Sequence, residues 1–197
     1  MVRRFGNALL VAAMLMARTA QAQDFVFGVH NGDTQTRQLT RSGYTTFEQG
    51  STRGLAGAIR MKPWLAFSLE LLLVDKGVLS SRAKPHRYFE VPYMARIASP
   101  WQFRNVRPFV AVGAAYAYEL TCDQECASSD RVTTDFSRVH AWGATYTWNR
   151  LEVALEQRRT RGQNSVNRRP DRYATNDMRS LLLRLSLVIP GIVPDWM

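Results

Sequence analysis

The segment Leu65-Ala66-Phe67-Ser68-Leu69-Glu70-Leu71 decides the fold of this chain. Its odd-numbered positions carry large apolar side chains, whereas a serine and a glutamate stand among its even-numbered positions. Alternation with a period of two is the pattern of a β-strand whose two faces meet different surroundings. An apolar face backed by charged residues is typical of a wall between lipid and water.

Similar alternation recurs along the chain, and we expect each such segment to form a strand. The eight expected strands lie near Phe25–Gly32, Arg53–Met61, Trp64–Asp75, Arg87–Ala98, Pro108–Leu120, Asp135–Trp148, Arg150–Arg161 and Met178–Ile189.

The connections between these strands alternate between short and long. The short ones are Lys62-Pro63, Trp148-Asn149-Arg150 and the somewhat longer Ser99–Arg107. Short turns at one rim and long polar loops at the other are typical of bacterial outer-membrane barrels. The sequence therefore predicts an all-β fold, an eight-stranded antiparallel up-and-down transmembrane β-barrel. The expected long polar connections are Asp33–Thr52, Lys76–His86, Cys122–Thr134 and Gly162–Asp177.

The strand parity also predicts which charged residues point into the barrel. Four acidic and four basic side chains share the inward face, and an unpaired charge in a narrow lumen is costly. We therefore expect a structural network of ion pairs that fills the lumen. Its predicted members are Arg60, Glu70, Glu90, Arg96, Glu152, Glu156, Arg158 and Arg184.

The N-terminus has the three parts of a secretory signal peptide. Arg3 and Arg4 form a charged region, residues 8–16 an apolar core, and Ala20-Gln21-Ala22 an A-x-A cleavage site. No later apolar run is long enough for a transmembrane helix, which needs about 18 residues or more. The expected organisation is a signal peptide at 1–22, a barrel at 23–190 and a short C-terminal tail at 191–197.

The chain is basic, with 26 Lys and Arg against 16 Asp and Glu. The export signal argues against nucleic acid as a partner, so outer-membrane lipid and lipopolysaccharide are the more natural anionic partners. Basic residues that merely solvate the loops remain an equal alternative. Cys122 and Cys126 are candidates for a short loop disulfide, ahead of free thiols. No histidine has ligand spacing with this pair, and we expect neither a metal nor a cofactor.

The last long connection is the best binding candidate. Its guanidinium groups could contact phosphates of an anionic surface ligand through paired hydrogen bonds. The alternative is a soluble loop whose charge keeps it out of lipid. The arginines concerned are Arg159, Arg161, Arg168, Arg169 and Arg172.

Four stretches resemble the PorT-like outer-membrane β-barrel family. They are the strand Leu69–Gly77 with its Lys-Gly end, the Tyr-x-Glu-x-Pro segment Tyr88–Tyr93, the strand Arg107–Gly113, and the charged strand Leu151–Arg158. The resemblance covers the mature chain and implies a small porin-family barrel, inserted into the outer membrane by the barrel assembly machinery. It implies fold and location more than activity. The chain departs from such barrels at its end, because Pro190 follows Ile189 where a closing aromatic residue is usual.

The sequence favours a structural, adhesive or surface-binding barrel over three other functions. An enzyme is not expected, because His140 lacks a serine two positions on and no hydrolase, metalloprotease or phosphate-loop motif occurs. A soluble lipocalin-like barrel would place the apolar residues inside. A narrow pore would require a hydrated lumen.

Overall fold

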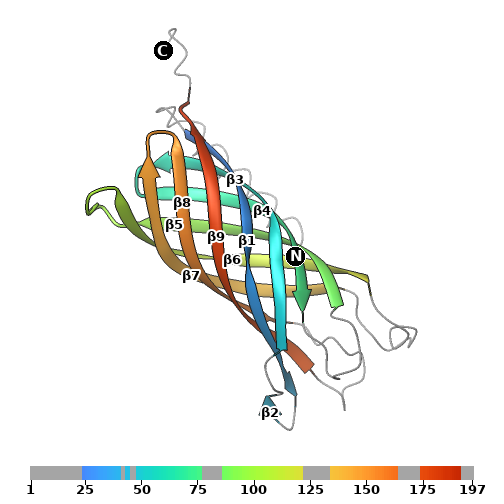
Figure 1. Ribbon diagram of the computed structural model, residues 1–197. Coiled ribbons are helices and arrows are strands. Elements are labelled where there is room, and N and C mark those ends of the chain that lie inside the picture. Colours follow the sequence, from blue (N-terminus) through green and yellow to red (C-terminus); the bar gives the residue numbers. More distant parts are fainter. Residues whose placement is uncertain are drawn as a thin grey trace, which may run out of the picture.

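A computed structural model describes residues 24–40, 43–44, 48–76, 86–121, 134–163 and 174–191 (Figure 1). Within these residues the chain forms strands joined in a single antiparallel sheet. The strands are β1 (Asp24–Thr40), β2 (Gly43–Tyr44), β3 (Glu48–Lys62), β4 (Leu65–Lys76), β5 (His86–Ala98), β6 (Val106–Thr121), β7 (Thr134–Trp148), β8 (Leu151–Gly162) and β9 (Ala174–Ile189).

The sheet closes on itself because β1 pairs with both β3 and β9. The closing seam runs from Phe25 opposite Ile189 to Thr40 opposite Ala174. The two-residue strand β2 pairs only with the end of β1, so the wall of the barrel consists of the other eight strands. The predicted fold class, a closed eight-stranded antiparallel barrel, is confirmed.

Short turns connect the strands at one rim. Pro63 and Trp64 join β3 to β4, and Asn149 and Arg150 join β7 to β8. Asn149 has φ of 55°, a left-handed conformation that asparagine tolerates better than most residues and that suits a tight hairpin. In Figure 1 the β7–β8 turn lies at the upper rim and β2 at the opposite rim.

Two of the predicted long loops are shorter than expected. The segment Asp33–Thr52 is mostly strand, because β1 continues to Thr40 and β3 begins at Glu48. This part is polar but rich in β-branched threonine, and its side chains still alternate. Thr34 and Thr36 are buried, and Thr34 Oγ1 donates a hydrogen bond to the carbonyl of Asp75 at 3.2 Å. Likewise β9 begins at Ala174, inside the expected connection, because it pairs along the extended β1.

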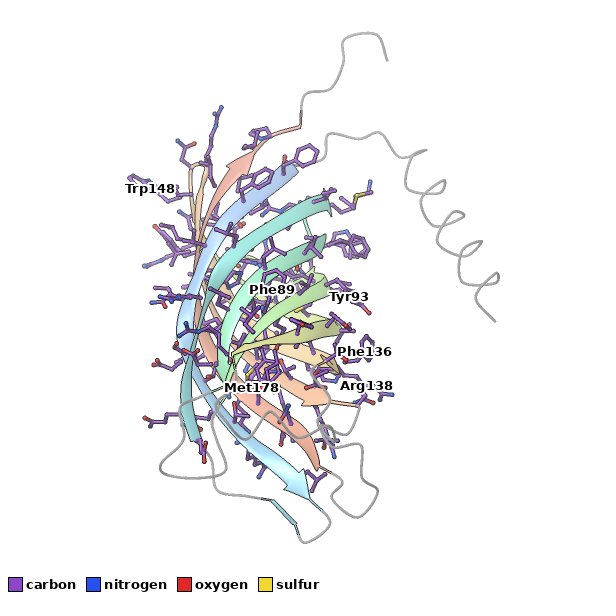
Figure 2. The ribbon with its side chains drawn as sticks, turned by 90° about the vertical axis from the view of Figure 1, so that its right-hand side faces the viewer. Phe89, Tyr93, Phe136, Arg138, Trp148 and Met178 are labelled. Carbon is purple, nitrogen blue, oxygen red and sulfur yellow. The ribbon has the colours of Figure 1, made fainter. Side chains whose placement is uncertain are left out.

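The two faces of the wall differ in chemistry as the parity predicts. Leu69 is 55% exposed on the outward face of β4, whereas its neighbour Glu70 is fully buried inside. Figure 2 shows that Tyr93 and Trp148 also project outward, as Leu69 does. A soluble lipocalin-like barrel has the opposite arrangement, with apolar side chains inside. The outward apolar face is broad, and its largest β4 and β9 members are Phe67, Leu69, Leu71, Leu181, Leu183, Leu185, Leu187 and Ile189.

Several features predicted from the sequence lie outside the described residues. They include the signal peptide, the cysteine pair and most of the C-terminal tail. No helix in the described ranges is long and apolar enough to cross a membrane.

Candidate functional site

The centre of the lumen is an ion-paired cluster around Arg158 of β8. Its guanidinium Nη1 lies 2.8 Å from Oε2 of Glu70 on β4, and its Nη2 lies 2.6 Å from Oε1 of Glu156 on β8. All three side chains are at most 1% exposed. In the ring of eight strands β4 lies opposite β8, so the Arg158–Glu70 pair spans the lumen. Charge-assisted hydrogen bonds of this kind compensate for the loss of water around both groups.

Two further arginines connect β8 to β5 and β3, the two strands that flank β4. Arg96 of β5 lies 3.2 Å from Glu156, and its guanidinium stacks 3.8 Å from the ring of Phe109. Arg60 of β3 lies 2.5 Å from Glu152, nearer the short-turn rim. The acidic residues of β8 therefore face basic residues from across the barrel, and these contacts hold opposite parts of the wall together.

A third cluster contains residues that the sequence reasoning missed. Lys76 was expected in a loop, but it ends β4 with its side chain 3% exposed inside the barrel. Its Nζ lies 3.3 Å from Glu90 and 3.8 Å from Asp135, and 4.6 Å from the ring of Tyr88. Lys76 continues the even-numbered inward series through Glu70. Extending that parity by one residue past the predicted strand end at Asp75 would have found it.

The last predicted network member, Arg184 of β9, is buried on the inward face but forms no ion pair with a described carboxylate. Its Nε has no hydrogen-bond partner among the described atoms. Arg184 lines a cavity of about 50 Å³ at the short-turn end, together with Arg60, Arg96 and Glu152. His30 of β1, which was not predicted, lies 3.5 Å from Glu70 in the central cluster.

Small side chains make room for these arginines. Alanines occupy much of the inward face of β6, where Ala111 and Ala115 pack with Ala141 and Val139 of β7 and with Met94 of β5. A small apolar group of Leu72, Val74 and Met178 lies in the long-loop half, beside the Lys76 cluster. The lumen is therefore a packed core of mixed polarity.

The predicted basic loop is partly strand, which corrects its placement. Arg159 and Arg161 lie in β8 and face outward, as the exposed Leu151 and Leu155 do on the same strand. Arg168, Arg169 and Arg172 lie outside the described residues.

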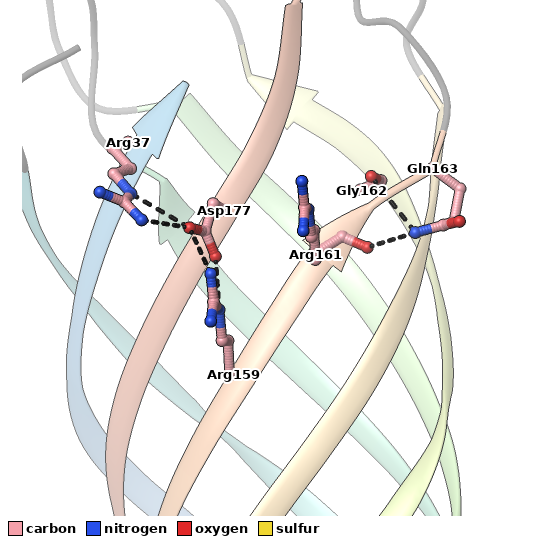
Figure 3. Close-up of polar contacts among 6 residues, drawn as sticks. All are labelled: Arg37, Arg159, Arg161, Gly162, Gln163 and Asp177. Atoms are coloured by element: carbon pink, nitrogen blue, oxygen red, sulfur yellow. Dashed lines mark hydrogen bonds and ion pairs between the residues drawn. The ribbon is translucent and has the colours of Figure 1, made fainter. Parts of the chain in front are cut away.

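An outward ion-paired cluster joins three strands beside this position (Figure 3). Asp177 of β9 accepts hydrogen bonds from Arg37 of β1 at 2.8 and 3.0 Å. The same carboxylate accepts two from Arg159 of β8, both at 3.0 Å. Asp177 is therefore buried between two guanidinium groups, and it links the closing seam to β8. The sequence predicts a loop that includes Asp177, whereas the structure places this residue in β9.

No protein-family model matches the chain, and no curated protein matches it either. The fold is similar to that of Neisserial surface protein A, with a TM-score of 0.54 and 14% identity. That match covers 81% of this chain and 96% of the other. It is also similar to the outer membrane protein OprG from Pseudomonas aeruginosa, with a TM-score of 0.53, 12% identity, and coverage of 85% and 96%. The PorT-like resemblance stays a prediction. The chain has the fold of these small barrels, an eight-stranded closed wall, and in this chain the wall surrounds an ion-paired lumen.

Proposed function

We propose that this chain is a small outer-membrane barrel protein of a diderm bacterium, with a structural, adhesive or surface-binding role. The observation that carries the proposal is the distribution of polarity across the wall. Outward leucines such as Leu69 and Leu183 are more than half exposed, while Glu70 and Arg158 are buried inside. A surface of that apolar extent is unfavourable in water and favourable in lipid.

The height of the outward apolar face supports the same setting. On β9 the outward apolar residues run from Leu181 to Ile189. At roughly 3.4 Å per residue this stretch is about 27 Å long. A strand tilt of about 40° reduces its height to about 20 Å, near the apolar band of outer-membrane barrels.

The expected signal peptide at 1–22 would direct export, and the barrel assembly machinery would insert the mature chain. The PorT-like resemblance agrees with this location. In this orientation the short turns face the periplasm, and the long connections reach the cell surface, where outer-membrane lipid and lipopolysaccharide are the surrounding partners. Anchoring and presenting those connections is the role we assign to the wall.

We assign the chain no catalytic role, and we expect its lumen to be closed to solutes. His140 and Trp142 share the outward face of β7, so the position two residues after the histidine carries no nucleophile. Arg158, Glu156 and Glu70 occupy the middle of the lumen, where a permeating solute would have to pass. In planar bilayers the purified protein should show no steady conductance. Stable single-channel steps would instead favour the narrow pore.

The experiment that tests the proposal is gel mobility in SDS with and without boiling, on protein extracted from fractionated cells. A closed barrel resists SDS until it is heated, so we expect a heat-dependent shift and recovery from the outer-membrane fraction. Protein that is recovered in the soluble periplasmic fraction and shows no shift would contradict the proposal.

A further inference from the structure

We propose that the outward face of β7 and β8 carries a binding site for the phosphate group of a membrane lipid beside the barrel. The site, here called the basic patch, consists of Arg138, His140, Arg159 and Arg161. This inference rests on the proposed function, because that function puts the patch at the lipid surface on the long-loop side. The corresponding ligand class is a phosphorylated glycolipid of the outer leaflet.

The register of three adjacent strands sets a sharp boundary between apolar and charged residues. Trp142, Gln157 and Leu181 stand opposite one another on β7, β8 and β9, with leucines and aromatic residues towards the short turns. The next outward-facing row, two residues along each strand towards the long loops, consists of His140, Arg159 and Arg179. Outward neighbours on a strand are about 7 Å apart. A lipid whose acyl chains lie on the apolar rows would therefore have its headgroup at the charged row.

The basic patch is hollowed. A cavity of about 420 Å³ is lined by all four of its side chains, with Leu39, Gly162, Gln163 and Thr175 at its edge. Such a volume is within the range of small-ligand sites and is ample for a phosphorylated sugar. Figure 2 shows Arg138 projecting outward beside Phe136, away from the lumen.

The charges around the cavity leave it strongly basic. Arg138 and Arg161 form no ion pair with a carboxylate in the part of the chain that the structure describes. Arg159 is different, because Asp177 holds its Nε and Nη2 at 3.0 Å and so fixes the direction of its guanidinium group. Another outward acid, Asp33, lies on β1 three outward positions before Leu39, the β1 residue at the edge of the cavity.

Guanidinium groups suit this ligand better than ammonium groups would. Each planar guanidinium presents paired N–H donors that match two oxygens of a phosphate. In the β7–β8 register Arg161 stands directly opposite Arg138. Two opposed guanidiniums can thus donate to one phosphate from both sides. The apolar rows below would add acyl-chain contact, which distinguishes a lipid from a free anion.

The test is retention of lipid A by the full-length protein in detergent, measured by native mass spectrometry. The variant R138Q/R161Q removes two charges that have no carboxylate partner among the described residues, and it leaves the Arg159–Asp177 contact in place. The matched control R53Q/R150Q removes the same number of positive charges elsewhere. Arg53 is exposed on β3, and Arg150 is exposed at the opposite rim. Bis-phosphorylated and dephosphorylated lipid A are the two probes, and inorganic phosphate is the competitor.

We expect wild type and the control to retain the bis-phosphorylated lipid, and R138Q/R161Q to lose about tenfold or more in affinity. The dephosphorylated lipid should bind weakly to all three. Equal binding of both lipids, or equal loss in the control, would overturn the site. Displacement by millimolar inorganic phosphate would identify a free-anion site instead and overturn the lipid. A heat-dependent mobility shift, recorded for every variant, separates loss of the site from failure of the barrel itself.

Discussion

Arg158 of β8 contacts Glu70 of β4 across the full width of the lumen, with 2.8 Å between Nη1 and Oε2. These residues are 88 positions apart in the chain, and the contact exists only when the barrel is closed. Because both are buried, removing Glu70 leaves the Arg158 guanidinium with Glu156 as its remaining carboxylate partner among the described residues. Closure of the wall and formation of this buried ion pair therefore depend on each other.

The first prediction concerns this pair. Glu70→Ala should lower the free energy of unfolding by about 1.5–3 kcal/mol, because Arg158 loses its cross-lumen partner and keeps only Glu156 among the described carboxylates. Urea unfolding in lipid vesicles, followed by tryptophan fluorescence, measures the change. Asp33→Ala, which removes an exposed outward carboxylate, is the control and should have little effect. An unfolding midpoint for Glu70→Ala equal to that of wild type would exclude Glu70 from a buried pair.

The second prediction concerns Lys76 and Glu90. Lys76→Met and Glu90→Gln should each destabilise the barrel, because each leaves an opposite charge buried. The double variant should be more stable than the sum of the two losses predicts, with a coupling energy of about 1–3 kcal/mol. A double-mutant cycle of unfolding free energies checks this. Strict additivity would mean that the 3.3 Å contact does not contribute to stability.

The third prediction compares two strand glycines. A Cβ at Gly113 would overlap the carbonyl oxygen of Tyr93 and crowd Met94, whereas a Cβ at Gly57 would find its nearest neighbours 4.0 Å away. Gly113→Ala should therefore cost about 1–3 kcal/mol, since the neighbouring backbone must move. Gly57→Ala is the matched control and should be neutral or stabilising. Similar unfolding midpoints for the two variants would show that β5 and β6 are not in such close contact at this point.

The fourth prediction concerns the outward cluster. Asp177→Ala should remove the hydrogen bonds that Arg37 and Arg159 donate to this carboxylate, and it should loosen the long-loop end of the closing seam with little change in global stability. Hydrogen exchange of the amides near Met178 and Thr36, which pair across the seam, measures this. Exchange should rise there and remain unchanged near Phe25 and Ile189, at the other end of the same seam. Unchanged protection at both ends would show that the seam does not depend on this cluster.

Alternation made the strands and their inward faces predictable, because one-residue parity determines which side chains share a face. The segment around Leu69 and Glu70 is the clearest case. The polar ends of β1 and β3 were missed, since threonine-rich strands that pair beyond the apolar wall look like loops when strands are sought by apolar content. Lys76 and Asp177 were assigned to loops for the same reason.

The ion pairs between opposite strands could not be predicted from the sequence. Parity places Arg158 and Glu70 inside, and the strand order places β8 opposite β4, but whether the two side chains meet at the same height depends on the register of the intervening strands. The basic patch has the same origin. His140 and Arg159 belong to different segments, and only the β7–β8 register sets them side by side.

The most direct test of the central claim is spin labelling along β4 in lipid vesicles, on a background in which Cys122 and Cys126 are replaced by serine. Labels at Phe67, Leu69 and Leu71 should show high accessibility to oxygen, which concentrates in lipid. Labels at Ser68 and Leu72 should show low accessibility, because both face the packed lumen. Leu72 is the informative position, since an apolar side chain there points inward. Accessibility that follows side-chain hydrophobicity instead of parity, or that shows no alternation, would contradict the lipid-facing barrel.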